Sequence, residues 1–172
     1  KNYPALFGAY EELIAQQPDT LNNYLSYASE MFDYVFTGDN KPADADVYIP
    51  KIETNLKRTL GANYETLNSN LIMAQMYYNI GLDQATEADK LKASTKPDDK
   101  KKKDDFKAKA IAKYDQAIPY TEKVVAELEG KGVTTLKAAE KVMLRNMYIM
   151  LSDMYALKGN KARRANHKQD RG

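Results

Sequence analysis

The sequence predicts an all-α protein, and three observations carry this prediction. Alanine, leucine, lysine, glutamate, aspartate, asparagine and tyrosine dominate the 172 residues, whereas glycine (8) and proline (6) are sparse. Runs of β-branched residues, which favour strands, are nearly absent. Apolar residues recur three and four positions apart through most of the chain, as on the buried face of a helix. The length suits one domain with its own core, and no apolar run approaches the roughly 18 residues of a membrane span, so we expect a soluble chain.

The first half of the chain contains four predicted helices. Apolar residues at helical spacing fill 4–17, which is followed by a proline. The next helix, 20–36, is apolar on more than one side, so we expect it to be central. After a turn-rich loop the pattern resumes at 47–60, and a fourth helix is expected at 65–80.

The second half begins with a change of character. Residues 83–104 are strongly charged and nearly devoid of apolar groups, which indicates an insertion that forms a solvated linker or a helix extension. Helices are then expected at 106–128 and 136–157. A basic tail, 160–172, follows, and we expect a short helix in it at 161–168.

Two of these helices share an ordered pattern of aromatic, small and glycine residues. The copies are Tyr148-x2-Leu151-Ser152-x2-Tyr155-x3-Gly159 and Met73-Ala74-x2-Tyr77-x3-Gly81, in which Asn70 holds the leading aromatic position. This order resembles the first helix of a tetratricopeptide repeat, whose signature is W-x2-L-G-x2-Y. The family's second helix has the spacing A-x3-F-x2-A, which is matched by Ala110, Tyr114 and Ala117.

The resemblance implies a fold and a place for partners. Tetratricopeptide repeats stack antiparallel helix pairs into a right-handed α-solenoid, and their first helices line a concave groove. We therefore expect residues 1–172 to form one domain of this kind. The array is irregular, because tryptophan is absent, 20–36 is a degenerate copy, and Gly81 and Gly159 are 78 residues apart instead of about 34 or 68.

Transferring the family's frame onto the sequence places eight residues on the groove side. They are Asn68, Leu71, Gln75, Tyr78, Asn79, Asn146, Ile149 and Asp153. Some family members hold a C-terminal carboxylate with lysine and asparagine, but the matching positions here hold Leu71, Gln75, Ile149 and Asp153, so that clamp is absent. Amide side chains at such positions could instead hydrogen-bond an extended backbone.

The thirteen tyrosines are the main excess in the composition. Most of them fall at helical spacings and are expected to pack between helices, with the hydroxyl at the rim of the core. Tyr78 and Tyr120 are candidates for exposed interface anchors.

Residues suited to catalysis or metal binding are scarce. There is no cysteine, and the one histidine, His167, lies in the basic tail. Asp39, Asp44 and Asp46 lack the glycine and distal glutamate of a calcium loop. Glycine-rich phosphate loops are also missing. The sequence therefore predicts no enzymatic activity, no cofactor and no metal site.

We expect a scaffold that binds a protein or peptide segment, or a subunit of a larger assembly. With 26 basic and 24 acidic side chains, the net charge of +2 does not favour nucleic acid. The alternative is a module that binds a polyanion, nucleic acid or acidic lipid, through Lys100–Lys103 and the basic tail. An enzyme built on helical repeats has no candidate residues.

The location of the protein is weakly indicated. The chain starts at Lys1 without a methionine, which fits either a processed exported protein or a piece of a longer one. Resemblance to the tyrosine-rich repeat proteins of bacterial cell envelopes favours export to the periplasm or envelope over the cytoplasm.

Overall fold

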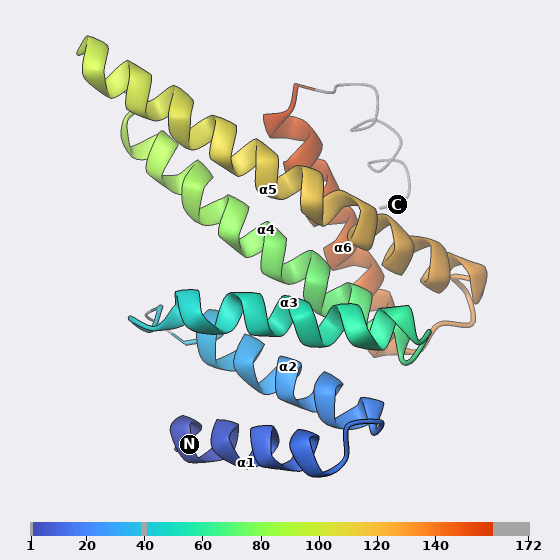
Figure 1. The fold of residues 1–172 in the computed structure, drawn as a ribbon. Coiled ribbons are helices and arrows are strands. Elements are labelled where there is room, and N and C mark those ends of the chain that lie inside the picture. Colours follow the sequence, from blue (N-terminus) through green and yellow to red (C-terminus); the bar gives the residue numbers. More distant parts are fainter. Residues whose placement is uncertain (1, 39–40, 160–172) are drawn as a thin grey trace. The chain divides into compact units, whose positions relative to one another are not determined.

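The computed structural model describes residues 2–38 and 41–159, and within these ranges it contains six helices and no strand (Figure 1). The helices are α1 (Tyr3–Gln16), α2 (Leu21–Phe36), α3 (Ala45–Gly61), α4 (Thr66–Lys90), α5 (Pro97–Gly130) and α6 (Ala138–Leu157). This confirms the all-α class. The arrangement as a tetratricopeptide solenoid stays a prediction, and the short helix expected at 161–168 lies outside the described residues.

The charged segment 83–104 is mostly a helix extension. α4 continues to Lys90, and α5 begins at Pro97, so only a short stretch between them is not helical. Proline suits the first position of a helix, and Asp98 and Asp99 in the first turn face the positive end of the helix dipole. The Ser94 hydroxyl donates to the Asp99 carboxylate at 2.6 Å, which adds a local contact at this helix start.

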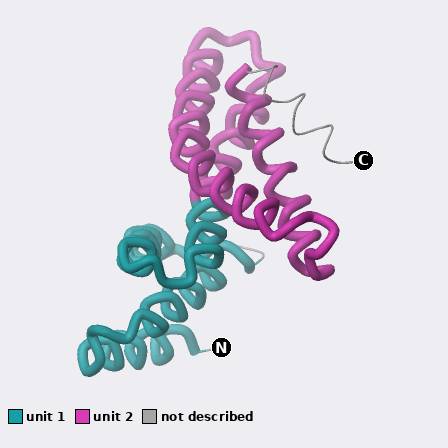
Figure 2. The backbone as a smooth tube through the Cα atoms, turned by 90° about the vertical axis from the view of Figure 1, so that its right-hand side faces the viewer, with its two compact units in different colours: residues 1–76 teal, residues 77–172 magenta. Residues whose placement is uncertain are grey.

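The contacts divide the chain into two compact units (Figure 2). Unit 1 is Lys1–Met76 and unit 2 is Tyr77–Gly172, so the boundary falls inside α4. The prediction of a single repeat-built domain is not tested by this division.

In unit 1, α1 packs on α2 and α2 packs on α3. Their junction is aromatic: the buried Phe7 ring lies 5.7 Å from the Tyr27 ring and 4.8 Å from the Tyr48 ring, measured between centroids. The Glu11 carboxylate of α1 accepts from the Tyr27 hydroxyl at 2.8 Å and from the Lys51 ammonium at 2.6 Å. One side chain of α1 therefore joins all three helices.

In unit 2, α5 packs on α6. Tyr155 of α6 donates its hydroxyl to Glu122 of α5 at 2.6 Å. About two helical turns away, Tyr148 of α6 donates to Glu129 of α5. Both tyrosine rings are buried, while their hydroxyls meet carboxylates at the edge of the core. For this pair of tyrosines the expectation of buried rings with hydroxyls at the core rim is confirmed.

The glycine that closes the second motif copy lies against a tyrosine of the matching second helix. A Cβ atom added to Gly81 of α4 would lie 2.5 Å from the Tyr114 ring of α5, and Tyr114 is itself buried. The motif copy that ends at Gly81 and the second-helix motif that contains Tyr114 thus meet in unit 2. Because glycine has no side chain, the Tyr114 ring can lie directly against the backbone of α4.

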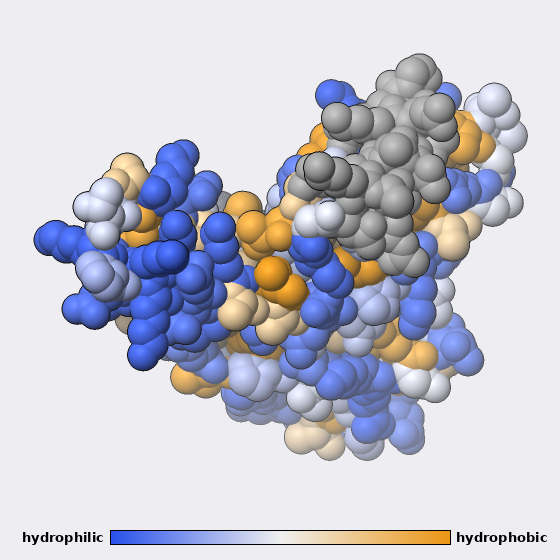
Figure 3. All heavy atoms as spheres, turned by 90° about the horizontal axis from the view of Figure 1, so that it is seen from above, coloured by the Kyte–Doolittle hydropathy of each residue, from blue (hydrophilic) through white to orange (hydrophobic). Residues whose placement is uncertain are grey.

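No helix in the described part of the chain is both long and apolar enough to cross a membrane. Figure 3 shows one face of the molecule, where hydrophilic residues cover most of the visible area and hydrophobic residues gather in small areas between them. Among the described residues, the large hydrophobic side chains that lie exposed are Val47, Leu82, Val133 and Val142.

Candidate partner-binding groove

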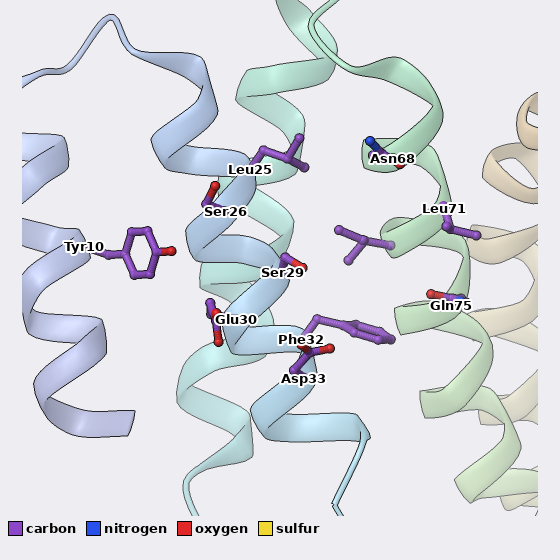
Figure 4. Close-up of a pocket in the computed structure, with 11 residues that line it drawn as sticks. Tyr10, Leu25, Ser26, Ser29, Glu30, Phe32, Asp33, Asn68, Leu71 and Gln75 are labelled. Carbon is purple, nitrogen blue, oxygen red and sulfur yellow. The ribbon is translucent and has the colours of Figure 1, made fainter. Parts of the chain in front are cut away.

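Unit 1 contains a groove of about 520 Å³ between α1, α2 and α4 (Figure 4). Its lining residues are Tyr10 of α1; Leu25, Ser26, Ser29, Glu30, Phe32 and Asp33 of α2; and Asn68, Leu71, Ile72 and Gln75 of α4. This volume lies in the range of protein binding pockets, about 300–1,000 Å³. We call this feature the unit 1 groove.

The α2 wall of the groove combines polar and apolar groups. Ser26, Ser29 and Asp33 recur at spacings of three and four residues, so one stripe of the helix presents them together. Phe32 is only 9% exposed and points from α2 toward α4 (Figure 4). Its burial supplies a fixed apolar surface beside the polar stripe.

Tyr10 comes to the groove from α1 and points toward α2 (Figure 4). Its ring stacks on Tyr27, with 5.3 Å between ring centroids and an interplanar angle of 11°. Tyr27 is buried, and its own hydroxyl is held by Glu11. This chain of contacts holds the Tyr10 ring in place before any ligand arrives.

The orientation of the α4 wall is fixed by the buried residues on the opposite face of that helix. Ser69 and Met73 are fully buried, and the Ser69 hydroxyl lies 2.8 Å from the Thr59 hydroxyl of α3. With that face held in the core, Leu71, Ile72 and Gln75 are left half-buried along the groove. Asn68 is exposed at its upper end and donates to Glu65 at 3.1 Å.

Three of the eight residues predicted on the groove side therefore line the unit 1 groove: Asn68, Leu71 and Gln75. The other five belong to unit 2. Of these, Asn79 on α4 and Ile149 on α6 are half-buried, and Asn146 on α6 is exposed.

Tyr78 and Asp153 lie together although 75 residues separate them in the sequence. The Tyr78 hydroxyl donates to the Asp153 carboxylate at 3.0 Å, and the Tyr78 ring stacks on Tyr114 with 5.7 Å between centroids. Burial, followed by the Asp153 charge, raises the pKa of Tyr78 above its ordinary value and that of Tyr114 to about 12. Asp153 is thus engaged within unit 2, and its carboxylate serves a structural contact.

The expectation that Tyr78 and Tyr120 are exposed anchors was wrong. Both side chains are half-buried. Tyr120 stacks on Tyr77 with 6.1 Å between ring centroids, so each of the two rings already packs on another tyrosine.

Sequence reasoning missed Tyr10 and all the α2 residues of the groove. Because 20–36 is a degenerate copy of the repeat, the family's frame places no groove residue on α2. A signal was present nonetheless: Ser26, Ser29, Glu30 and Asp33 put hydroxyls and carboxylates at helical spacing on one side of a helix whose other residues are largely apolar.

The other candidate sites of the sequence analysis fall elsewhere. Lys100–Lys103 lies on α5 near its start, between Asp98, Asp99 and the aspartates at 104 and 105. The described residues contain no group of three histidine, cysteine, aspartate or glutamate side chains that could hold a metal ion. The basic tail, His167 and Asp39 lie outside the described residues.

Comparison of the chain with models of known protein families, with curated proteins and with solved structures produced no match. The function must therefore be inferred from the groove and from the resemblance in the sequence.

Proposed function

We propose that the chain is a non-catalytic scaffold that holds a segment of a partner protein in the unit 1 groove, alone or as a subunit of a larger assembly. The observation that carries the proposal is the lining of this groove. Hydroxyl, amide and carboxylate groups from α1, α2 and α4 stand beside Leu25, Phe32, Leu71 and Ile72.

Such a lining suits a polypeptide. An extended segment presents backbone N–H and C=O groups along its length and side chains on alternate sides. Serine hydroxyls and the amides of Asn68 and Gln75 both donate and accept, so they can satisfy either backbone group. The apolar residues between them can receive a side chain of the segment.

Preorganisation also supports binding. Tyr10 is stacked on a buried ring and Phe32 is itself buried, so ordering these anchors costs little when a partner enters. The resemblance to tetratricopeptide repeats points the same way, because it makes α2 and α4 first helices, the helices that line the groove in that family.

Selection of peptides from a random display library on the whole chain tests the proposal. We expect enriched peptides to bind about tenfold more weakly to Gln75→Arg and to Asn68→Arg, because a long charged side chain obstructs the groove. Val47→Arg adds the same side chain at an exposed position on α3 and serves as the control. Peptides that bind all four proteins equally, or a selection without enrichment, would overturn the proposal.

A polyanion remains the other candidate, and its test is separate. Over residues 96–105, five lysines alternate in blocks with four aspartates, so the local charges nearly cancel. We expect a labelled single-stranded oligonucleotide to bind weakly at most. Tight binding with a steep salt dependence that Lys100–Lys103→Gln abolishes would favour the polyanion module instead.

A further inference from the structure

We propose that unit 2 carries a second interaction surface, on α5, which binds a short acidic segment of a partner protein. Three lysines at helical spacing form this surface: Lys109, Lys113 and Lys123. We call them the basic stripe. They belong to unit 2, so this surface goes beyond the function proposed for the unit 1 groove.

The charges of α5 are separated around the helix between residues 106 and 123. This stretch has two carboxylates, and both are engaged with α6: Asp115 accepts from Lys158, and Glu122 accepts from Tyr155. At about 100° per residue, the lysines of the basic stripe lie within about 80° of one another and at least about 80° from either carboxylate. Packing against α6 therefore leaves α5 with a separate side that carries only positive charge in this stretch.

Each lysine of the basic stripe holds its ammonium nitrogen over an aromatic ring of unit 2. The distances from nitrogen to ring centroid are 5.7 Å from Lys109 to Phe106, 5.6 Å from Lys113 to Tyr77 and 5.8 Å from Lys123 to Tyr120. Tyr77 and Tyr120 stack on each other, which fixes two of the three rings. Such cation–π contacts orient the ammonium groups but leave their N–H donors for a carboxylate.

Among the residues that the structure describes, no lysine of the basic stripe pairs with a carboxylate. Other lysines of unit 2 do so, since Lys90 pairs with Glu87 and Lys131 pairs with Glu140. Two lysines of the stripe are exposed, and the third, Lys113, is half-buried. Their charges can therefore attract the carboxylates of a partner.

The length of the basic stripe suits a short segment better than a long polyanion. From Lys109 to Lys123 the helix rises about 21 Å, at about 1.5 Å per residue. Duplex DNA presents about 12 charges over that length, at one per about 1.7 Å, against three lysines. Asp105, one turn before Lys109, would also repel a polyanion that continued past the stripe. An extended peptide covers the same distance with about six residues, at about 3.3 Å each, and can place three or four carboxylates along it.

Two fluorescein-labelled octapeptides test this chemistry by fluorescence anisotropy with the whole chain. The first has glutamate at alternate positions with serine or leucine between them, so its carboxylates can follow one side of an extended chain for about 20 Å. The second has glutamine in place of every glutamate. We expect the glutamate peptide to bind about tenfold more tightly than the glutamine peptide. Raising the salt concentration from about 0.05 M to about 0.5 M should reduce this preference, because exposed charges are screened.

Two variants locate the effect on α5. The stripe variant combines Lys109→Gln, Lys113→Gln and Lys123→Gln, and it should abolish most of the preference for glutamate. The matched control removes three charges from the same helix outside the stripe, by Lys100→Gln, Lys101→Gln and Lys103→Gln. It should retain most of the preference. Matching far-ultraviolet circular dichroism and thermal melts establish that both variants are folded.

The remaining outcomes count against the inference. Equal losses in the two variants would show that net charge, and not the basic stripe, attracts the peptide. Equal affinity for the two peptides, or no binding of either, would also overturn it. If a single-stranded oligonucleotide or phosphatidylserine vesicles bind more tightly than the glutamate peptide and the stripe variant releases them, the surface binds a polyanion instead. These outcomes leave the unit 1 groove untouched, since Gln75→Arg and Asn68→Arg test it separately.

Discussion

Tyrosine hydroxyls join neighbouring helices in both units by donating to carboxylates. Tyr27 donates to Glu11 in unit 1, and Tyr78 donates to Asp153 in unit 2. In each case the ring contributes apolar area to the core while the hydroxyl reaches a charged acceptor near its edge. A large tyrosine content can thus serve folding without any direct role in recognition.

The contact between Tyr155 and Glu122 allows this role to be measured. Tyr155→Phe keeps the ring but removes the donor, so we expect the free energy of unfolding to fall by about 1 kcal/mol. Urea denaturation monitored by circular dichroism gives this value. Tyr120→Phe, on α5 in the same unit, retains its stacking on Tyr77 and should change stability little. Equal effects of the two substitutions would contradict the assigned hydrogen bond.

Among the glycines that lie within the described helices, Gly81 is the one where an added methyl group meets the closest obstacle. Gly81→Ala would place Cβ within 2.5 Å of the buried Tyr114 ring. Overpacking costs about 1–3 kcal/mol, and the better helix propensity of alanine returns about 1 kcal/mol, so a net loss of up to about 2 kcal/mol is expected. Gly8→Ala on α1 meets no atom within 4 Å and should instead stabilise the chain. Thermal melts of the two variants measure both changes, and the melting temperature should fall for Gly81→Ala and rise for Gly8→Ala.

Carboxylates spaced seven residues apart connect α5 to α6. Asp115, Glu122 and Glu129 face Lys158, Tyr155 and Tyr148 in reverse order, as expected for antiparallel neighbours. A seven-residue step returns nearly to the same side of a helix, which brings all three carboxylates to one seam. The seam fixes the register of the two helices in addition to the apolar packing beneath it.

The charged extension of α5 depends on local interactions at its start. Replacing Asp98 and Asp99 with lysine reverses the favourable charge near the helix dipole and removes the acceptor for Ser94. We expect amide hydrogen exchange over residues 97–105 to accelerate about fivefold. The same change at Asp104 and Asp105, beyond the first turn, should have a smaller effect. Equal acceleration by the two pairs would contradict a dipole-dependent start.

Glu11 makes the packing of α1 sensitive to acid. Hydrogen bonds from Lys51 and then from Tyr27 lower its pKa below the ordinary 4.5. Its ionised form is therefore favoured by folding, so its contribution is fully present above about pH 4.5 and is lost as the pH falls through the lower pKa of the folded state.

The corresponding experiment follows the free energy of unfolding against pH. Glu11→Gln should flatten the decline below about pH 4.5, since the group that binds a proton on unfolding is gone. Glu12→Gln, which makes the same change at the exposed neighbouring position, provides the matched control. A decline that is the same in Glu11→Gln and in the unmodified chain would show that other carboxylates account for it.

At the scale of the whole molecule, periodicity predicted most of the helices because each has a clear local boundary. Pro18 follows α1, and Gly159 adopts a positive φ of 74° just beyond α6, where a left-handed residue ends a helix. The ends of α4 and α5 were less predictable, since a charged segment has no apolar pattern to distinguish a linker from a helix. The available clue was Pro97, since proline suits the first position of a helix.

The groove was only partly predictable. Asn68, Leu71 and Gln75 followed from the pattern on α4, whose buried face is clearly defined. The α2 wall was not predicted because that helix has apolar residues on several sides. Which side of α2 faces the groove therefore depends on its contacts with α1 and α3. Pairing between Tyr78 and Asp153 depends on three-dimensional packing, which no spacing within one helix reveals.

The central claim is that the groove of unit 1 recognises the partner. Photo-crosslinking in the cells that produce the protein tests it most directly, with p-benzoylphenylalanine placed at Gln75, at Asn68 or at Val142, which is exposed on α6 of unit 2. The groove positions should give an adduct with the same discrete protein, and Val142 should not. An adduct formed from Val142 but from neither groove position would contradict the claim.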